Sequence, residues 1–152
     1  MIVVDTNVIA YFFLQGEQTQ QAEAVYEQDS EWVASYLWRS EFRNVLALYL
    51  RQGYLCLEDA IQIYQEAETL MQQGEYAIDA VAVLQLTFES GCSAYDCEYI
   101  VLAQQLGVPV ITADGTKCPL SPPDTLRERE RKLIASFPLV AIPIATFLQN
   151  LA

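Results

Sequence analysis

The chain has 152 residues, a formal net charge of −12 and 53% apolar residues. This length suits one domain, here 1–152, and the apolar content excludes an intrinsically disordered chain. Twenty acidic residues against eight basic ones exclude a mechanism that depends on a broad basic surface. The chain contains no histidine, which excludes Ser-His-Asp and Cys-His nucleophilic sites, histidine-ligated zinc and imidazole bases.

Strands and helices are predicted to alternate along the chain. Apolar runs without alternation predict strands buried on both faces, and apolar residues at i, i+3 and i+4 predict helices. In chain order we expect a strand at 2–4, a helix at 19–27, a strand at 31–34, helices at 37–52 and 57–73, a strand at 75–78, helices at 79–90 and 95–106, a strand at 108–112, a charged helix from 125 to about 136, a strand at 139–142 and a short helix starting at Pro143. This order predicts the α/β class, a three-layer α/β/α sandwich with a central, mainly parallel sheet.

Three features bear on where the chain works. The sequence reaches Asp5 too early for a secretory signal, so four cysteines without a CxxC pair are expected to be free thiols in a reducing cytoplasm. The uncharged stretch 133–152 has the length of a membrane span. Its prolines, with Gln149 and Asn150, favour a buried strand and a short helix instead. We therefore expect a cytoplasmic protein without a membrane span.

Four acidic residues occupy unusual positions. Asp5 and Asp114 come at or just past the ends of two predicted strands, where ligands bind in open α/β sheets. Glu41 and Asp96 lie on the apolar faces of predicted helices, and ionised side chains rarely face a core unless they are paired or bound to metal. The topology therefore allows these four carboxylates to gather in one crevice.

Each acid also has an ordinary structural interpretation. Asp5 can cap a helix that starts near Asn7, and Asp96 can be the acidic member of a capping box with Ser93. Glu41 can lie at the edge of its apolar stripe and reach water. Asp114 is a good turn residue. Taken one at a time, the acids leave both interpretations open.

Four carboxylates in one crevice would repel one another and raise each other's pKa values. Divalent cations relieve this repulsion, and ligation by oxygen alone selects hard ions such as Mg²⁺ or Mn²⁺. Such ions bridge phosphate oxygens and lower the pKa of a bound water. The set therefore predicts metal-assisted hydrolysis of a phosphodiester, a reaction that needs no histidine.

Three segments resemble the PIN-domain family, most closely its VapC-type toxins. They are VVDTNVIAYFFL at 3–14, WRSEFRNVL at 38–46 and SAYDCEYIVLAQQLGVPVITAD at 93–114. The third is the most specific, with an aspartate on a helix, a tyrosine three residues later, a Gly-x-Pro turn and a strand ending Thr-x-Asp. The resemblance covers 1–114 well and the remainder loosely.

The resemblance implies a fold, a site and partners. PIN domains are ribonucleases on an α/β/α fold, so RNA is the expected substrate, and VapC-type members form homodimers held inactive by a small antitoxin protein. Thr6, Asn7 and Thr112 match residues that orient the family's carboxylates. The family's acidic quartet, which holds one or two Mg²⁺ or Mn²⁺ ions, corresponds to Asp5, Glu41, Asp96 and Asp114.

Two departures from the family pattern keep other hypotheses open. The segment after Asp114, GTKCPLSPPDTLRERERKL, is longer and richer in proline than usual, and the acidic balance is unusual for a protein that approaches RNA. The alternative is a catalytically weak or inactive PIN-like protein that binds RNA or regulates. A third class is a phosphotransfer fold, such as a receiver or a haloacid-dehalogenase-like phosphatase, but the phosphatase pattern has Asp where this chain has Asn7.

Positive charge is local. Arg127 and Arg131 share a face of the predicted charged helix, where they serve either as solvated ion-pair partners or as phosphate contacts. Arg39 and Arg43 lie almost opposite Glu41 on their helix and are expected to serve an interface.

Overall fold

Five short strands form one parallel sheet in the computed structural model, which describes residues 1–113 and 141–143. The order is β3-β2-β1-β4-β5, so the first strand is central and the chain adds strands on both of its sides. Each of the four strand pairs is parallel, with Val3 beside Val33 on one side and Val110 on the other. The strands are β1 (Ile2–Val4), β2 (Trp32–Ser35), β3 (Glu75–Tyr76), β4 (Val110–Thr112) and β5 (Ala141–Pro143).

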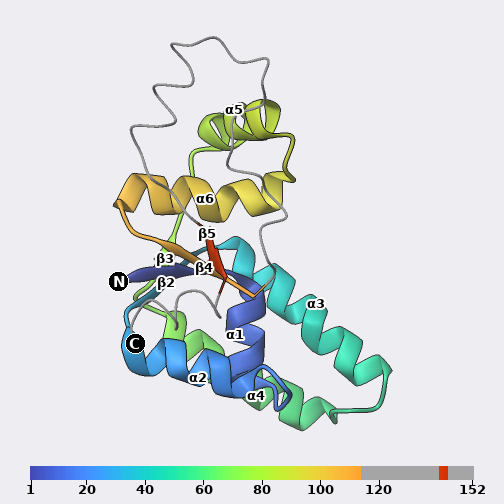
Figure 1. Ribbon diagram of the computed structural model, residues 1–152. Helices are drawn as coiled ribbons and strands as arrows, with labels where there is room; N and C mark the ends of the chain where they lie inside the picture. Colours follow the sequence, from blue (N-terminus) through green and yellow to red (C-terminus); the bar gives the residue numbers. More distant parts are fainter. Residues whose placement is uncertain (114–140, 144–152) are drawn as a thin grey trace.

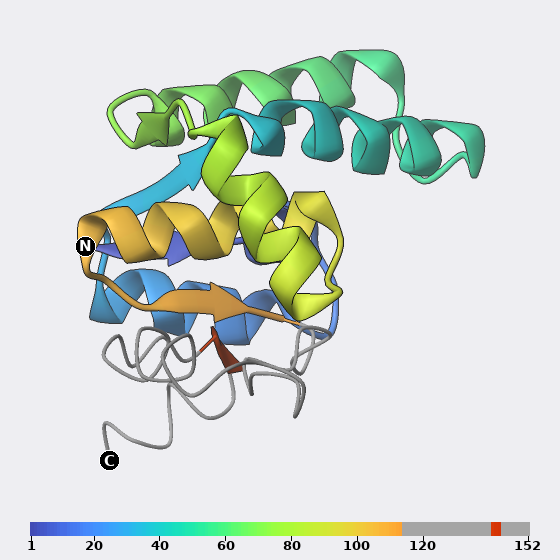
Figure 2. The same ribbon diagram turned by 90° about the horizontal axis from the view of Figure 1, so that it is seen from above.

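Helices cover both faces of this sheet, as predicted (Figure 1). On one face α6 packs against β1, β2 and β4, and α5 crosses over its outer side (Figure 2). The other face is covered by α1, α2 and α4, while α3 and α4 extend side by side away from the sheet. The helices are α1 (Thr6–Phe13), α2 (Thr19–Gln28), α3 (Leu37–Arg51), α4 (Leu57–Met71), α5 (Ala80–Ser90) and α6 (Ala94–Leu106).

Side-chain oxygens cap the N-termini of three of the described helices, and the Cys56 sulfur caps α4. Oδ1 of Asp5 accepts a hydrogen bond from the backbone of Val8, and Asp79 caps α5 in the same way. Ser93 caps α6 through the backbone of Asp96. Such caps satisfy amide groups that a helix leaves without partners, each at about 1 kcal/mol. The capping interpretation of Asp5 is therefore correct, although it uses only one of the two carboxylate oxygens.

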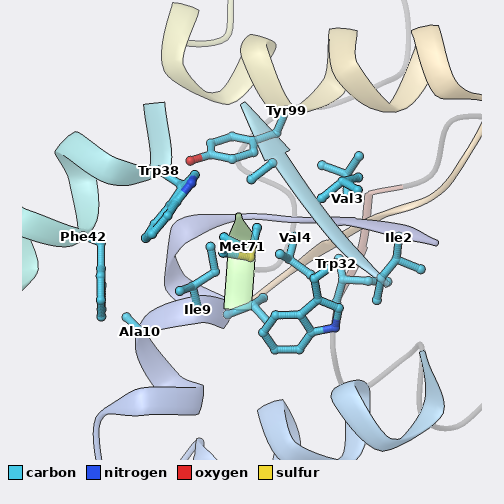
Figure 3. Close-up of a cluster of buried hydrophobic side chains, with 14 of the residues drawn as sticks. Ile2, Val3, Val4, Ile9, Ala10, Trp32, Trp38, Phe42, Met71 and Tyr99 are labelled. Atoms are coloured by element: carbon cyan, nitrogen blue, oxygen red, sulfur yellow. The ribbon is translucent and has the colours of Figure 1, made fainter. Parts of the chain in front are cut away.

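A continuous core joins the sheet to the helices on both faces (Figure 3). Val3 and Val4 of the central strand are completely buried, and Trp38 and Phe42 carry the buried face of α3 into the same cluster. In Figure 3 the ring of Tyr99 extends from α6 toward Trp38 at the start of α3. The core therefore places the start of α3 close to the middle of α6.

Arg39 links α3 to its neighbours within the chain. Its guanidinium donates to both carboxylate oxygens of Glu75, at 2.5 and 2.9 Å, and also to Glu68 of α4 and to the Tyr64 hydroxyl. Trp38 Nε1 donates to Glu75 as well, at 2.8 Å. The Arg39 guanidinium, with help from Trp38, lowers the pKa of Glu75 below its ordinary value. A half-buried charge pair therefore ties α3 to β3 and α4.

Several predicted details differ from the structure. The strand at 108–112 starts at Val110, because the amide of Val108 still bonds to Ala103 and ends α6. Pro143 belongs to β5, and the helices predicted at 125–136 and after Pro143 lie outside the described residues. Cys56 and Cys97 are free thiols, but Cys92 is disulfide-bonded, so the prediction of four free thiols was wrong. Among the helices that the structure describes, none has the length and apolar character to cross a membrane.

Candidate active site

The carboxyl ends of the parallel strands meet at one edge of the sheet, and Asp5 and Thr112 lie there side by side. Asp5 follows β1 directly, and Thr112 ends the neighbouring strand β4. The Thr112 hydroxyl donates a 2.5 Å hydrogen bond to Oδ2 of Asp5, while Oδ1 accepts from the Val8 amide at 3.0 Å. Both oxygens of this half-buried carboxylate therefore have a fixed direction.

Glu41 enters the same region from α3 and is held by two hydroxyl groups. Its Oε2 accepts hydrogen bonds from Thr6 Oγ1 at 2.7 Å and from the Tyr99 hydroxyl at 2.6 Å. Thr6 and Tyr99 are each 5% exposed, and their hydroxyl oxygens lie 2.7 Å apart. Three helices far apart in the sequence, α1, α3 and α6, thus meet at one carboxylate oxygen.

The electrostatics of this cluster favour a neutral phenol beside negative charge. Burial raises the pKa of Tyr99 far above its ordinary value, and the carboxylates of Glu41 and Asp5 raise it further. Tyr99 therefore stays protonated and serves as a hydrogen-bond donor. No Lys or Arg forms an ion pair with Glu41 within the part of the chain that the structure describes. Among the described residues, hydroxyl groups rather than cations hold this acid.

The other predicted site residues are not joined to Asp5 or Glu41 by hydrogen bonds of the described residues. Asp96 is exposed in the first turn of α6, where its amide donates to the Ser93 hydroxyl oxygen and its carboxylate accepts from that hydroxyl at 2.6 Å. Ser93 therefore caps the helix, but the backbone hydrogen bond from Ser93 to Asp96 that completes a capping box is not among those of the described residues. No hydrogen bond connects Asp96 to Asp5 or Glu41 among the described residues. Asn7 is half-buried and makes no side-chain hydrogen bond in residues 1–113. Asp114 lies outside the described residues.

The donor chemistry fits a hard cation, but the described residues alone do not assemble a complete ligand set. Within residues 1–113 and 141–143, no three Asp, Glu, Cys or His side chains come close enough to hold a metal ion. The described candidates offer oxygen atoms only, and Oε1 of Glu41 accepts no hydrogen bond from a described residue. Such donors suit Mg²⁺ or Mn²⁺ and are poor ligands for copper or for structural zinc.

Tyr99 is the residue of this cluster to which sequence reasoning gave no role. It stood out as a tyrosine three residues after Asp96 on an apolar helix face. Buried phenols usually find a hydrogen-bond partner, and Glu41 was the predicted acid on the apolar face of another helix. The signal that could have identified Tyr99 is therefore the coincidence of a phenol and an acid on the apolar faces of two helices, which predicts a hydrogen bond from Tyr99 to Glu41.

Comparisons with known proteins agree on one family. A family model described as the PIN domain matches residues 2–116. Ribonuclease VapC3 of Pyrobaculum aerophilum is 29% identical over 119 residues, which span 74% of this chain and 88% of that protein.

Solved structures show the same fold. PAE2754 from Pyrobaculum aerophilum has a TM-score of 0.63 and 19% identity, covering 99% of this chain and 95% of its own. FitAcB from Neisseria gonorrhoeae has a TM-score of 0.60 and 21% identity, with 75% and 88% covered. The structure of FitAB bound to an IR36 DNA fragment gives 0.62 and 17%, with 95% of both chains covered. At these identities the structures establish the fold alone.

Proposed function

The chain belongs to the PIN domain family, and from this premise we propose that it is a divalent-metal-dependent endoribonuclease, the toxin of a toxin–antitoxin pair. The observation that carries the proposal is the convergence of Asp5 and Glu41, through Thr112, Thr6 and Tyr99, at the carboxyl edge of the sheet. The relative named ribonuclease VapC3 supports the choice of RNA as substrate.

Four acids would hold the metal in this proposal. Asp5, Asp96 and Asp114 are the principal ligands, and Glu41 completes the site directly or through water. A bound Mg²⁺ or Mn²⁺ supplies an activated water and stabilises charge on the leaving oxygen. The chain's own contribution is orientation: Thr112 and the Val8 amide fix the Asp5 carboxylate, and Thr6 and Tyr99 fix that of Glu41.

The acidic composition adds a requirement. With a net charge of −12 the protein repels RNA at long range. The carboxylates of the site would therefore need a bound divalent cation to offset their charge when a phosphate approaches. We further propose that the protein works in the cytoplasm as a homodimer. We also propose that a small antitoxin holds it inactive, a proposal that the relative named VapC3 supports.

The test compares two aspartates that cap helices in the same way. Asp5→Ala and Asp79→Ala each remove one N-cap hydrogen bond, which should cost about 1 kcal/mol of stability. Asp5→Ala also removes the acceptor of the Thr112 hydroxyl, so its total cost should be about 1 kcal/mol larger. Cleavage of structured RNA with Mn²⁺ should be lost in Asp5→Ala and retained in Asp79→Ala. Calorimetry should also show weaker Mn²⁺ binding for Asp5→Ala alone. Undiminished cleavage by Asp5→Ala would reject the assignment.

A second candidate is a PIN-like protein that binds RNA or regulates with weak or absent cleavage. The net charge of −12 is the observation that favours it. RNA that binds under saturating Mn²⁺ without turnover would support this candidate over the nuclease.

A further inference from the structure

A pocket of about 330 Å³ opens at the carboxyl ends of β2 and β3, beside the acidic site. Its walls include Tyr36, Tyr76, Ile78, Val83, Leu84 and Glu98. The volume lies at the lower end of the roughly 300–1,000 Å³ typical of small-molecule sites. It suits one nucleoside and is too small for a longer stretch of chain.

The pocket adjoins the candidate active site through three elements. Tyr36 follows β2 directly and precedes α3, which carries Glu41. Glu98 lies between Asp96 and Tyr99 on α6. Neighbouring strands are about 4.8 Å apart, so the ends of β2 and β3 lie about one and two strand spacings from Asp5 at the end of β1. That separation is comparable to one nucleotide.

The two tyrosines give the pocket an aromatic wall at a fixed place. The Tyr36 amide donates to the Tyr76 carbonyl oxygen at 3.1 Å, so the backbones that carry both rings are joined. Tyr36 is 54% exposed, which leaves a ring face open to a ligand. With Ile78, Val83 and Leu84 as apolar neighbours, this lining suits a flat aromatic group that stacks.

Glu98 sets the polarity of the ligand. Its half-buried carboxylate has no hydrogen-bond or ion-pair partner among the described residues. A carboxylate repels phosphate and accepts hydrogen bonds from N–H groups, so it selects a base over the RNA backbone. Guanine offers two adjacent N–H donors on its Watson–Crick edge and can bind both oxygens. Adenine, cytosine and uracil place an acceptor next to their donor.

We propose that this pocket binds a guanine base of single-stranded RNA next to the scissile phosphate, stacked on Tyr36 and read by Glu98. The proposal rests on the proposed nuclease function for its substrate class. It assigns a nucleotide preference to residues outside the acidic set.

The first experiment measures binding without cleavage. Guanosine, adenosine, cytidine and uridine are uncharged, so they avoid the repulsion of an acidic protein, and ligand-observed NMR in metal-free buffer reports their affinities. Guanosine should bind about tenfold tighter than the others, because one bidentate base contact discriminates at about that level. Equal binding of the four nucleosides, or no binding, would overturn the proposal.

Matched variants locate the site. Glu98→Gln should abolish the guanosine preference, and Tyr36→Ala should weaken guanosine binding about tenfold. The controls are Glu58→Gln at the start of α4 and Tyr54→Ala, whose ring is 70% exposed beyond the end of α3. Both controls should bind like the wild type. If Glu98→Gln keeps the preference, Glu98 does not read the base and the proposal fails.

The second experiment separates this proposal from the nuclease assignment. Short RNAs that carry a single guanine are incubated with Mn²⁺, and the cleaved bond is mapped. Cleavage next to the guanine in the wild type, shifting to several positions in Glu98→Gln, supports the pocket. Cleavage without any base preference rejects the pocket but leaves the nuclease standing. Guanosine binding without any cleavage supports the pocket and rejects the nuclease.

Discussion

Thr112 and Asp5 are 107 positions apart in the sequence, yet the threonine hydroxyl donates a 2.5 Å hydrogen bond to the aspartate. The contact exists because β1 and β4 are parallel neighbours whose carboxyl ends coincide. With the Val8 amide on its other oxygen, the Asp5 carboxylate is oriented by the protein alone. This orientation lowers the reorganisation needed when a cation binds.

Removing the Thr112 hydroxyl should therefore weaken metal binding more than it weakens the fold. We expect Thr112→Val to lower Mn²⁺ affinity roughly 10–100-fold, the usual cost of losing a group that orients a ligand. Thr112→Ser keeps the hydroxyl and should stay close to the wild type. Calorimetric titration with Mn²⁺ checks both variants. Equal Mn²⁺ affinities for Thr112→Val and Thr112→Ser would show that the Thr112 hydroxyl does not orient Asp5 for metal binding.

Tyr99→Phe should destabilise the protein by about 1–2 kcal/mol at neutral pH, because a buried hydrogen bond to a carboxylate is lost. The variant should also change how the free energy of unfolding depends on pH in the alkaline range. The folded protein raises the pKa of Tyr99, so its stability contribution is complete below the unfolded pKa near 10 and declines as pH rises above it.

Urea unfolding at pH 7 and at about pH 10.5 measures both effects of Tyr99→Phe. The difference in stability between wild type and variant should shrink or reverse at the higher pH. Tyr54→Phe is the control, since that ring is largely exposed. A stability difference that stays the same at both pH values would contradict the buried, neutral phenol.

The Arg39–Glu75 pair should control stability in acid. Arg39 lowers the pKa of Glu75, so the pair's contribution is complete above the ordinary glutamate pKa near 4.3 and is lost as pH falls below it. Arg39→Gln should cost about 2–3 kcal/mol at pH 7, since it leaves a largely buried carboxylate without its cation.

Stability measured from about pH 6 down to pH 3 should fall less steeply in Arg39→Gln than in the wild type. Arg43→Gln serves as the matched control, because exposed Arg43 donates only to Ser40 on its own helix among the hydrogen bonds of the described residues. If the free energy of unfolding fell equally steeply with decreasing pH in Arg39→Gln and in the wild type, the Arg39–Glu75 pair would not be the cause of the loss of stability in acid.

Gly74→Ala should damage the junction between α4 and β3. A Cβ at this position would lie 2.1 Å from the Trp32 carbonyl oxygen, and Gly74 accepts the 2.8 Å hydrogen bond from Ala34 that helps to pair β3 with β2. We expect a loss of about 2–3 kcal/mol in urea unfolding, at the upper end for overpacking. Gly53→Ala meets no atom within 4 Å and should lose only about 1 kcal/mol for its positive φ.

The fold was predictable because its signals are local and repeated. Apolar runs such as Ile2–Val4 can only be buried on both sides, and Gly107 ends a periodic helix just before the next strand. Element bounds were less predictable. The helix-ending hydrogen bond from Val108 to Ala103 depends on backbone conformation and leaves no mark in a hydrophobic pattern.

The sequence identified Asp5 and Glu41, two acids that the structure brings to the same region, but not the network that holds them. Strand ends identified Asp5, and an apolar helix face identified Glu41. The hydroxyl contacts that hold them join α1, α3 and α6, and sequence spacing says nothing about such distances. The same limit applies to Arg39, whose partners Glu68 and Glu75 come from other elements.

The burial of Thr6 and Tyr99 has an evolutionary consequence. Both side chains are enclosed in the interior, so their replacement would harm folding whether or not the protein still cuts anything. A homologue without catalytic activity would therefore still keep both residues, so their presence in a homologue is no evidence that it is an active enzyme. Asp96 is exposed and contributes little to the core, so under the proposed function a lineage that lost cleavage should accumulate substitutions at Asp96 first.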